Sequence, residues 1–310
     1  MDKRGSCIKC GRRTRHVVEG KYLCIYCDVG LEEKITKAEE EIISIVNDAQ
    51  LSPKELKSLL EQKPGIRQKV YDHSSSGRIR IGIISDTHIG HEKFDEGLFK
   101  YAGEVFRKEK IKNVYHAGDI LEGMSGRDGN VFELSQVGFS RQITYAKELF
   151  SKYFKGLKVF AIQGNHDNWY KIRNNGGIVV GEELQNRLGK DKFEYLGECE
   201  ADIKLADNVV MKLFHPGDGT AYATSYKLQK LIESLEGGTK PKIIIEGHYH
   251  KALYMFNRGV HGIEAGTICS QTGWMRGKKI PAQKGFYILD IETDKRGIKS
   301  FTPKFYPAYD

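Results

Sequence analysis

Five short motifs, each placed directly after an apolar run, constrain this 310-residue chain more than any other feature. In chain order the motifs are Asp86-Thr87-His88, Gly118-Asp119, Gly164-Asn165-His166-Asp167, His215 and Gly247-His248-Tyr249-His250. The apolar runs before them cover residues 79–85, 111–116, 157–163, 209–214 and 242–246, and their β-branched content indicates buried strands. Open α/β sheets place their sites at the carboxyl ends of strands, so we expect the motif side chains to converge.

The motifs supply carboxylate and amide oxygens and imidazole nitrogens, but no thiolate. Such ligands suit hard or borderline divalent ions; we expect Mn²⁺ first, with Fe²⁺, Zn²⁺ or Mg²⁺ as alternatives. A single Asp-x-His, or one histidine at a strand end, occurs often by chance. Five such motifs in order after five strands favour a metal site.

The order of the motifs resembles that of the calcineurin-like metallophosphoesterases, over about residues 78–292. The sequences around Asp86 and Asp119 are most similar to the DNA-repair exonuclease branch of that family. The resemblance implies an α/β fold of the αββα type, in which two packed β-sheets are flanked by helices. We expect those helices at residues 94–108, 134–153, 181–188 and 221–235.

The resemblance also implies two neighbouring divalent ions. The first would be held by Asp86, His88, Asp119 and His250. The second would share Asp119 and be completed by Asn165, His215 and His248. Two cations roughly 3.5–4 Å apart neutralise a phosphate ester, acidify a bridging water for attack, and stabilise the attacking and leaving oxygens.

The histidine of the third motif has a different role in the family. The resemblance assigns His166 to the substrate, where it would stabilise the transition state or protonate the leaving oxygen. We expect Asp167 to orient the ring of His166 and fix its tautomer. The alternative is that both residues only cap a turn.

Near the N-terminus stand two C-x₂-C pairs, Cys7 with Cys10 and Cys24 with Cys27. This spacing predicts a zinc ribbon over residues 1–30 that holds one structural Zn²⁺, because so short a segment cannot build an adequate core. Two disulfides are the alternative. No signal peptide follows Met1, and an intracellular chain rarely keeps disulfides, which favours zinc.

We predict three parts: the zinc ribbon at residues 1–30, a helical linker at 31–77, and the metallophosphoesterase domain at 78–310. The ribbon is basic, which suits nucleic-acid phosphates, docking of a protein partner, or a merely solvated face. The net charge of +8 favours anionic partners. No apolar run is long enough to span a membrane, and we expect a cytoplasmic protein.

Several loops around the expected site combine aromatic with cationic side chains, which stack on bases and hold phosphates. The candidates for substrate binding are Arg127, Trp169, Lys171, Arg173, Trp274 and Arg276. The alternative is that both tryptophans pack beneath their loops.

These features predict a dinuclear metal-dependent phosphoesterase acting on nucleic acid, as a nuclease (phosphodiesterase) or an end-processing phosphatase. One alternative is the same chemistry on a small molecule or phosphoprotein, with the ribbon as a docking module. Another is a non-catalytic subunit of a nucleic-acid-processing complex, against which the complete ligand set counts. The sequence does not separate monoesters from diesters, or DNA from RNA.

Overall fold

The structure of the chain is a computed structural model. It describes residues 5–8, 13–14, 17–18, 21–22, 70–75, 77–172, 177–236 and 240–309. The chain divides into two compact units, Met1–Arg67 and Gln68–Asp310. In the first unit β1 (Gly5–Ser6) pairs with β2 (Arg13–Thr14), and β3 (Val17–Val18) pairs with β4 (Lys21–Tyr22).

The four predicted zinc ligands are only partly within the described residues. Cys7 is buried. Cys10, Cys24 and Cys27 lie outside the described residues. Residues 31–69 of the predicted helical linker also lie outside them. The zinc ribbon therefore stays a prediction.

The last part of the predicted linker belongs to the second unit. Val70–Asp72 forms strand β5, which runs parallel to Asp202–Lys204 of β10 (Glu200–Ala206). The sequence prediction, which kept this segment in the linker up to residue 77, is wrong at this end. A three-residue strand at a sheet edge is too short to give a periodic apolar pattern.

The first large sheet has the strand order β16-β15-β6-β7-β8-β9. Four strands run parallel: β6 (Arg78–Ile84), β7 (Asn113–Ala117), β8 (Lys158–Gln163) and β9 (Phe193–Glu198). The other two, β15 (Gly285–Asp294) and β16 (Gly297–Pro307), add an antiparallel edge. Burial along β7 and β8 is nearly continuous, as expected for parallel strands that are covered on both faces.

The second large sheet has the order β13-β14-β12-β11-β10-β5. Its parallel centre is formed by β11 (Val209–Phe214), β12 (Ile243–Glu246) and β14 (Val260–Ala265). The strand β13 (Ala252–Asn257) closes one edge by antiparallel pairing with β14. All five strands predicted before the motifs are therefore present, as β6, β7, β8, β11 and β12.

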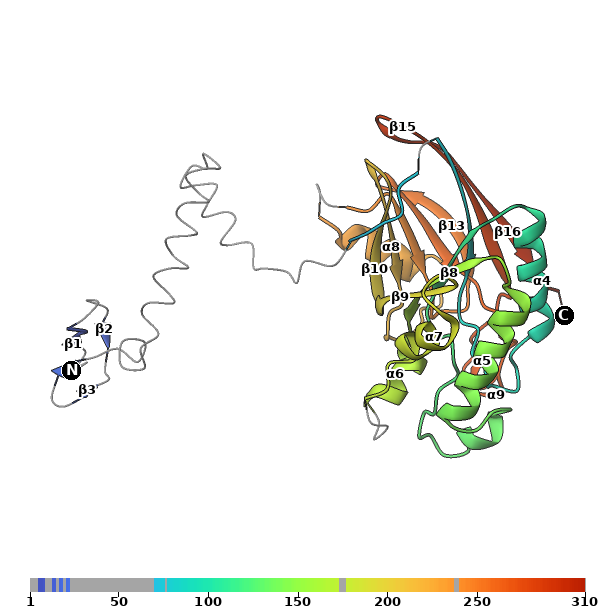
Figure 1. Ribbon diagram of the computed structural model, residues 1–310, viewed down its shortest axis with the longest axis horizontal. Coiled ribbons are helices and arrows are strands. Elements are labelled where there is room, and N and C mark those ends of the chain that lie inside the picture. Colours follow the sequence, from blue (N-terminus) through green and yellow to red (C-terminus); the bar gives the residue numbers. More distant parts are fainter. Residues whose placement is uncertain are drawn as a thin grey trace. The chain divides into compact units, whose positions relative to one another are not determined.

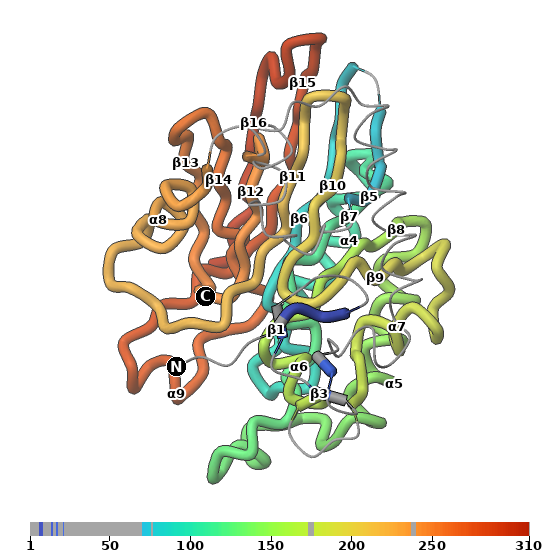
Figure 2. Tube along the Cα trace, turned by 90° about the vertical axis from the view of Figure 1, so that its left-hand side faces the viewer, coloured from blue at the N-terminus to red at the C-terminus, as the bar shows by residue number. Residues whose placement is uncertain are grey.

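Helices cover the outer faces of both sheets (Figures 1 and 2). The first sheet carries α4 (Glu96–Lys108), α5 (Phe139–Tyr153) and α7 (Val180–Leu188), and the second carries α8 (Tyr226–Ser234). Two short helices near the site, α6 (Asn165–Ile172) and α9 (Gly273–Gly277), were not expected from the sequence. None of the described helices combines the length and apolarity needed to cross a membrane.

Three apolar cores separate these layers. Phe99 and Phe150 belong to the core between the helices and the first sheet. Ile83 and Met211 belong to the core between the two sheets. A small third core holds α8 against the second sheet through residues such as Ile232. The predicted αββα sandwich is therefore confirmed.

Three helices begin later than predicted, and for α4 and α5 the reason is local. The α4 helix begins after Asp95, whose carboxylate accepts a hydrogen bond of 2.8 Å from the amide of Leu98 as an N-cap. The α5 helix begins after Gly138, which has a φ of 86° that ordinary residues rarely adopt. The segment before it contains a short 3-10 turn, η1 (Asn130–Glu133), rather than the start of the helix.

Candidate metal centre

The five motifs meet at one end of the sandwich, because each follows the carboxyl end of a parallel strand. The strands are β6, β7 and β8 in the first sheet and β11 and β12 in the second. Three overlapping groups of side chains form there, and within each group the candidate ligand atoms all lie within 4.8 Å of one another. The groups are Asp86 with His88 and His250, His88 with Asp119 and His166, and Asp119 with His215 and His248.

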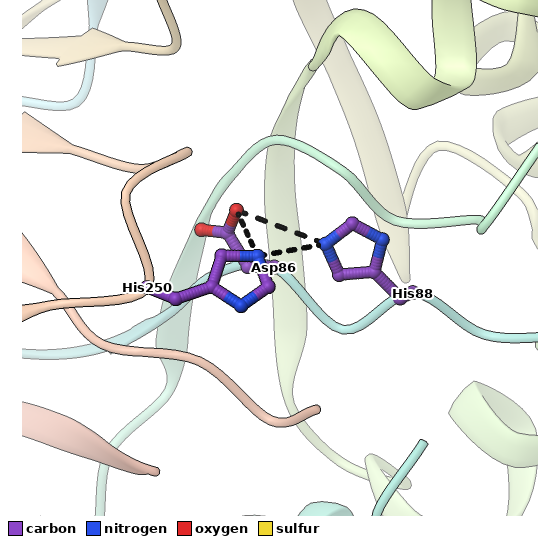
Figure 3. Close-up of side chains that lie close together, drawn as sticks. All are labelled: Asp86, His88 and His250. Carbon is purple, nitrogen blue, oxygen red and sulfur yellow. Dashed lines mark hydrogen bonds and ion pairs between the residues drawn. The ribbon is translucent and has the colours of Figure 1, made fainter. Parts of the chain in front are cut away.

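The first group brings three donor atoms to one point (Figure 3). His250 Nε2 lies 3.0 Å from His88 Nε2 and 3.4 Å from Asp86 Oδ1. His88 Nε2 lies 3.9 Å from Asp86 Oδ1. All three side chains are buried, so the donor atoms face one another rather than water.

The carboxylate of Asp119 lies between the first group and the third. Its Oδ2 atom is 3.8 Å from His88 Nε2 and 3.2 Å from His215 Nε2. Asn165 Oδ1 is 3.2 Å from the same nitrogen of His215. One side chain is thus placed to touch two ions, which is the position that a bridging ligand requires.

Outer hydrogen bonds orient three of the histidine rings. His88 Nδ1 lies 2.9 Å from a carboxylate oxygen of Glu122, and His215 Nδ1 donates to the carbonyl of Ala117 at 2.7 Å. His248 Nε2 donates to the carbonyl of Asp218 at 2.7 Å. Because each ring has one nitrogen engaged in this way, the nitrogen left for an ion is Nε2 in His88 and His215 but Nδ1 in His248.

The backbone is left-handed at five of the candidate ligands, all of them non-glycine residues. The φ angles are 50° at Asp86, 47° at His88, 54° at Asp119, 79° at His248 and 54° at His250. Each such residue costs about 1–3 kcal/mol, and such residues cluster at functional sites. The sharp turns after β6, β7 and β12 are therefore maintained against a local cost.

The glycines of two motifs are required by the close approach of the strand ends. A Cβ atom on Gly118 would lie 2.4 Å from His215 Nδ1, and one on Gly164 would lie 2.1 Å from Asp119 Oδ1. Both distances are far below contact distance, so any side chain there would push the candidate ligands apart.

The two aspartates among the candidate ligands are held as carboxylates. Burial acts to raise the pKa of Asp86, but the hydrogen bond and charge of His250 outweigh it and hold the pKa at about 2. Burial also opposes ionisation of Asp119, whose pKa is nevertheless well below its usual range because of the charges of His215 and His166. Two buried carboxylates among imidazoles with oriented nitrogens fit divalent cations in charge and donor type.

Comparisons with known proteins agree with this geometry. Residues 79–294 match the calcineurin-like phosphoesterase superfamily domain. The chain belongs to that superfamily. The DNA polymerase II small subunit of Methanothermobacter thermautotrophicus is 25% identical over an alignment of 257 residues, and the match covers 69% of this chain and 51% of that protein. The protein of the same name from Thermoplasma acidophilum is 24% identical over an alignment of 279 residues, and the match covers 77% of this chain and 55% of that protein.

This chain spans about half the length of the curated relatives it matches. Among solved structures, one described as a novel archaeal phosphodiesterase is 18% identical, with a TM-score of 0.41. That similarity covers 74% of this chain and 100% of the other.

One buried residue of the candidate metal centre, Glu122, was missed by the sequence analysis. Its Oε2 atom lies 2.9 Å from His88 Nδ1 and 3.4 Å from His166 Nδ1, and His166 Nδ1 also donates to its carbonyl oxygen at 2.9 Å. Glu122 thus contacts a candidate metal ligand and the candidate substrate histidine together. The sequence signal that could have pointed to Glu122 is its position three residues after Asp119.

The charges around His166 favour a protonated ring. Burial acts to lower its pKa, but the carboxylates of Asp119 and Glu122 raise it to about 10. The charges and hydrogen bonds of His166 and His88 hold the pKa of Glu122 well below its usual range, although burial opposes this. With Nδ1 engaged by Glu122, the Nε2 atom of His166 is the nitrogen available to a substrate.

The expectation that Asp167 orients His166 is wrong. The carboxylate of Asp167 accepts hydrogen bonds from the backbone amides of Ile120 at 3.0 Å, Leu121 at 2.8 Å and Gly164 at 2.9 Å. These bonds tie the loop after β7 to the loop after β8. At the start of a helix, an acidic side chain next to a histidine can point toward the histidine or away from it. Adjacency in sequence therefore did not identify the partner of Asp167.

A pocket of about 610 Å³ opens above the candidate metal centre. Three of the predicted substrate residues line it, Arg127, Trp169 and Trp274, and the ring centre of Trp169 lies 3.9 Å from that of His166. Lys171 and Arg276 are not among its lining residues. Arg173 lies outside the described residues.

Proposed function

We propose that this chain is a metal-dependent phosphoesterase that hydrolyses phosphate ester bonds in nucleic acid through a centre of two divalent ions. The observation that carries the proposal is the position of Asp119 between two groups of ligand atoms, 3.2 Å from His215 and 3.8 Å from His88. When bound, two divalent ions would neutralise the phosphate and supply a water-derived nucleophile at neutral pH. Mn²⁺ is the first ion to test, because oxygen and imidazole ligands suit it.

The side chains divide into two sets around the shared carboxylate. The first ion would be held by Asp86, His88, Asp119 and His250. The second would be held by Asp119, Asn165, His215 and His248. The hydrogen bonds of the rings to Glu122, Ala117 and Asp218 keep the ligand nitrogens aimed at the ions.

His166 is the candidate general acid. Its Nδ1 atom is held by the carbonyl of Glu122, so its Nε2 atom can donate a proton to the leaving oxygen. Its pKa of about 10, which Asp119 and Glu122 raise against the effect of burial, refers to the centre without cations. Bound cations would lower that pKa toward the neutral range, where proton donation is most effective.

Two features favour nucleic acid over a small metabolite or a phosphoprotein as substrate. Trp169 and Trp274 line the pocket and can stack on bases. The chain carries a net charge of +8, which attracts a polyanion. The names of the curated relatives, DNA polymerase II small subunits, point the same way.

The experiment that tests the proposal is an activity panel with Mn²⁺. It compares aryl phosphomonoesters and phosphodiesters with single- and double-stranded DNA and RNA, each with and without excess chelator. We expect metal-dependent hydrolysis of an aryl ester and of at least one polynucleotide. Hydrolysis of small esters alone would favour a small-molecule or phosphoprotein substrate, and undiminished activity in chelator would overturn the two-ion centre.

A second candidate function is that of a non-catalytic subunit in a nucleic-acid-processing complex. The observation that favours it is the assembly named in the curated relatives, which are polymerase subunits. The predicted zinc ribbon would then be the docking module for a protein partner. Bound divalent ions without hydrolysis of any ester in the panel would support this function over the first.

A further inference from the structure

The candidate metal centre lies at the floor of its pocket rather than on an open surface. Asp86, Asp119 and His215 are at most 1% exposed. The pocket above them, about 610 Å³, is on the scale of a site for one small-molecule ligand. A phosphate that reaches this floor must carry its neighbouring nucleotides into a space that is too small for two paired strands.

One wall of the pocket is the short helix α9 with its flanking residues. Thr272 caps the helix by accepting a hydrogen bond of 3.1 Å from the amide of Met275, and Met275 is buried beneath it. Trp274 is 47% exposed and lines the pocket. The indole is therefore held on an anchored turn with a face open to a ligand.

Among the residues that the structure describes, the cations that follow Trp274 have no acidic partner. Arg276, Lys278 and Lys279 are exposed, and none of them forms an ion pair with another described residue. The cations elsewhere around the pocket differ, because Arg127 pairs with Glu133. The α9 segment therefore places an exposed indole in the pocket lining and, just outside that lining, positive charge that nothing within the described residues neutralises.

A second indole faces the same pocket from α6. Trp169 lines the pocket beside His166, with ring centres 3.9 Å apart. Both views of the fold place α6 and α9 at the same end of the domain (Figures 1 and 2). Aromatic rings that line a charged groove stack on successive bases of a single strand, independently of sequence.

We infer that the pocket takes single-stranded nucleic acid, with a base stacked on Trp274 and the strand's phosphates bound by Arg276, Lys278 and Lys279. The inference rests on the proposed phosphoesterase function and names its substrate. In a duplex each base is stacked and paired, so a face of the base reaches Trp274 only when the strand is unpaired. The α9 wall thus selects an unpaired strand or a frayed end.

Binding is measured first, by fluorescence anisotropy of the full chain in chelator, so that no cleavage occurs. The probes are a labelled DNA oligonucleotide, the same sequence as RNA, and the blunt DNA duplex. We expect tighter binding of at least one single strand than of the duplex; the DNA-to-RNA ratio identifies the preferred sugar. Equal or tighter binding of the duplex would overturn the inference.

Substitutions at Trp274 test the stacking. We expect Trp274→Ala to weaken single-strand binding about ten- to a hundredfold, the loss that one stacked base implies, and Trp274→Phe to retain most of the affinity. The matched control is Phe256→Ala, an aromatic residue of β13 that is 62% exposed and does not line the pocket. Unchanged single-strand affinity in Trp274→Ala would overturn the stacking role.

Charge substitutions test the phosphate contacts. Each of Arg276→Gln, Lys278→Gln and Lys279→Gln should reduce the slope of log affinity against log salt by about 0.7, the value for one phosphate of a single strand. Lys295→Gln, at the exposed turn between β15 and β16, is the control and should leave the slope unchanged. An unchanged slope in the triple variant would overturn these contacts.

Hydrolysis of an aryl phosphodiester separates this inference from the function on which it rests. Trp274→Ala should lose activity on single strands by a larger factor than on that small ester, whereas the control Phe256→Ala should keep the wild-type rate on both. If the wild-type chain fails on the small ester, the proposed function fails. If it hydrolyses the ester but cleaves blunt duplex as fast as single strand, only the single-strand inference fails.

Discussion

At the scale of single residues, the centre depends on carboxylates that are buried and nevertheless ionised. Asp86 and Asp119 are both within 1% of full burial, and the histidines around them hold their pKa values below the usual range against the effect of burial. A buried charge without partners is costly, so such residues are kept ionised only by neighbouring charge or by cations. Each carboxylate is therefore expected to be indispensable.

Replacement of Asp119 by Asn is expected to release metal and abolish activity. Asn leaves one neutral oxygen where a carboxylate touches both ligand groups, so both ion sites weaken together, and the rate should fall by several orders of magnitude. Elemental analysis and hydrolysis of an aryl phosphodiester provide the measurement. Asp207→Asn, in the exposed turn between β10 and β11, is the control; near-normal metal content in Asp119→Asn would contradict a bridging role.

Replacement of His166 by Ala should keep the ions but slow turnover. The loss should be about 10²–10⁴-fold for a poor leaving group, the usual contribution of a general acid, and much smaller for an activated aryl leaving group. Rates on the two ester classes, together with metal content, test this. The same loss on both classes would remove His166 from proton transfer.

Glu264 on β14 is expected to make stability depend on pH. It is buried, its carboxyl oxygens have no hydrogen-bond partner among the described residues, and burial raises its pKa from 4.5 to about 7 although Lys251 opposes the shift. The folded state therefore binds the proton of Glu264 more tightly than the unfolded state does. The stability that this proton contributes is complete below pH 4.5 and is lost as pH rises through 7.

Glu264→Gln should therefore be the more stable protein at alkaline pH, by on the order of 2 kcal/mol. Chemical denaturation at a series of pH values gives the free energy of unfolding for both proteins. Glu148→Gln, on an exposed position of α5, serves as the control. Parallel pH profiles for wild type and Glu264→Gln would contradict ionisation of Glu264 as the cause.

At the scale of elements, the loop between β11 and α8 links one candidate metal ligand to the pocket wall. The sequence predicted helix from residue 221, but α8 begins at Tyr226, and the preceding residues form a loop that lines the pocket. The carbonyl of Asp218 accepts a hydrogen bond from His248, and its carboxylate accepts hydrogen bonds from Lys227 and Tyr249. The loop is thus fixed at the residue that orients His248.

We expect Asp218→Ala to weaken one of the two ions selectively. Loss of the bonds to Lys227 and Tyr249 frees the loop, and an unsupported ligand histidine typically costs 10–100-fold in metal affinity. Calorimetric titration with Mn²⁺ should show one weakened site and one unchanged site. Tyr222→Ala, in the same loop but fully exposed, is the control. Equal weakening of both ion sites would show that Asp218 does not act through the orientation of His248.

At the scale of the whole molecule, the two compact units predict separable roles. The second unit begins at Gln68 and includes β5, so a chain that begins there retains every strand of both sheets and every candidate ligand. The four cysteines of the predicted ribbon all lie in the first unit. Catalysis on a small ester should therefore not need the first unit.

Deletion of residues 1–67 should leave aryl phosphodiester hydrolysis unchanged and remove one zinc ion per chain. If the basic ribbon contacts nucleic-acid phosphates, affinity for long nucleic acid should also fall, most clearly at low salt. Metal analysis, the ester assay and binding assays on both chains provide the test. Identical zinc content would reject the ribbon, whereas identical nucleic-acid affinity would leave it as a module for docking a protein partner.

The sequence alone determined the types of ligand and the strands that carry them. Ligand chemistry is a property of single side chains, and parallel strands bring their carboxyl ends to one edge, so Asp86, Asp119 and His215 could be placed together without coordinates. The apolar runs were long enough to reveal β6, β8 and β11, while the three-residue β5 was not.

Only the tertiary structure decided which groups orient the ligands. Glu122 meets His166 across 44 residues of sequence, Asp218 meets His248 across 30, and Asp167 binds backbone amides of another loop instead of its neighbour. Such pairs depend on how loops from different strands approach one another. That approach is set by the packing of two sheets around a shared core, and no local pattern of residues encodes it.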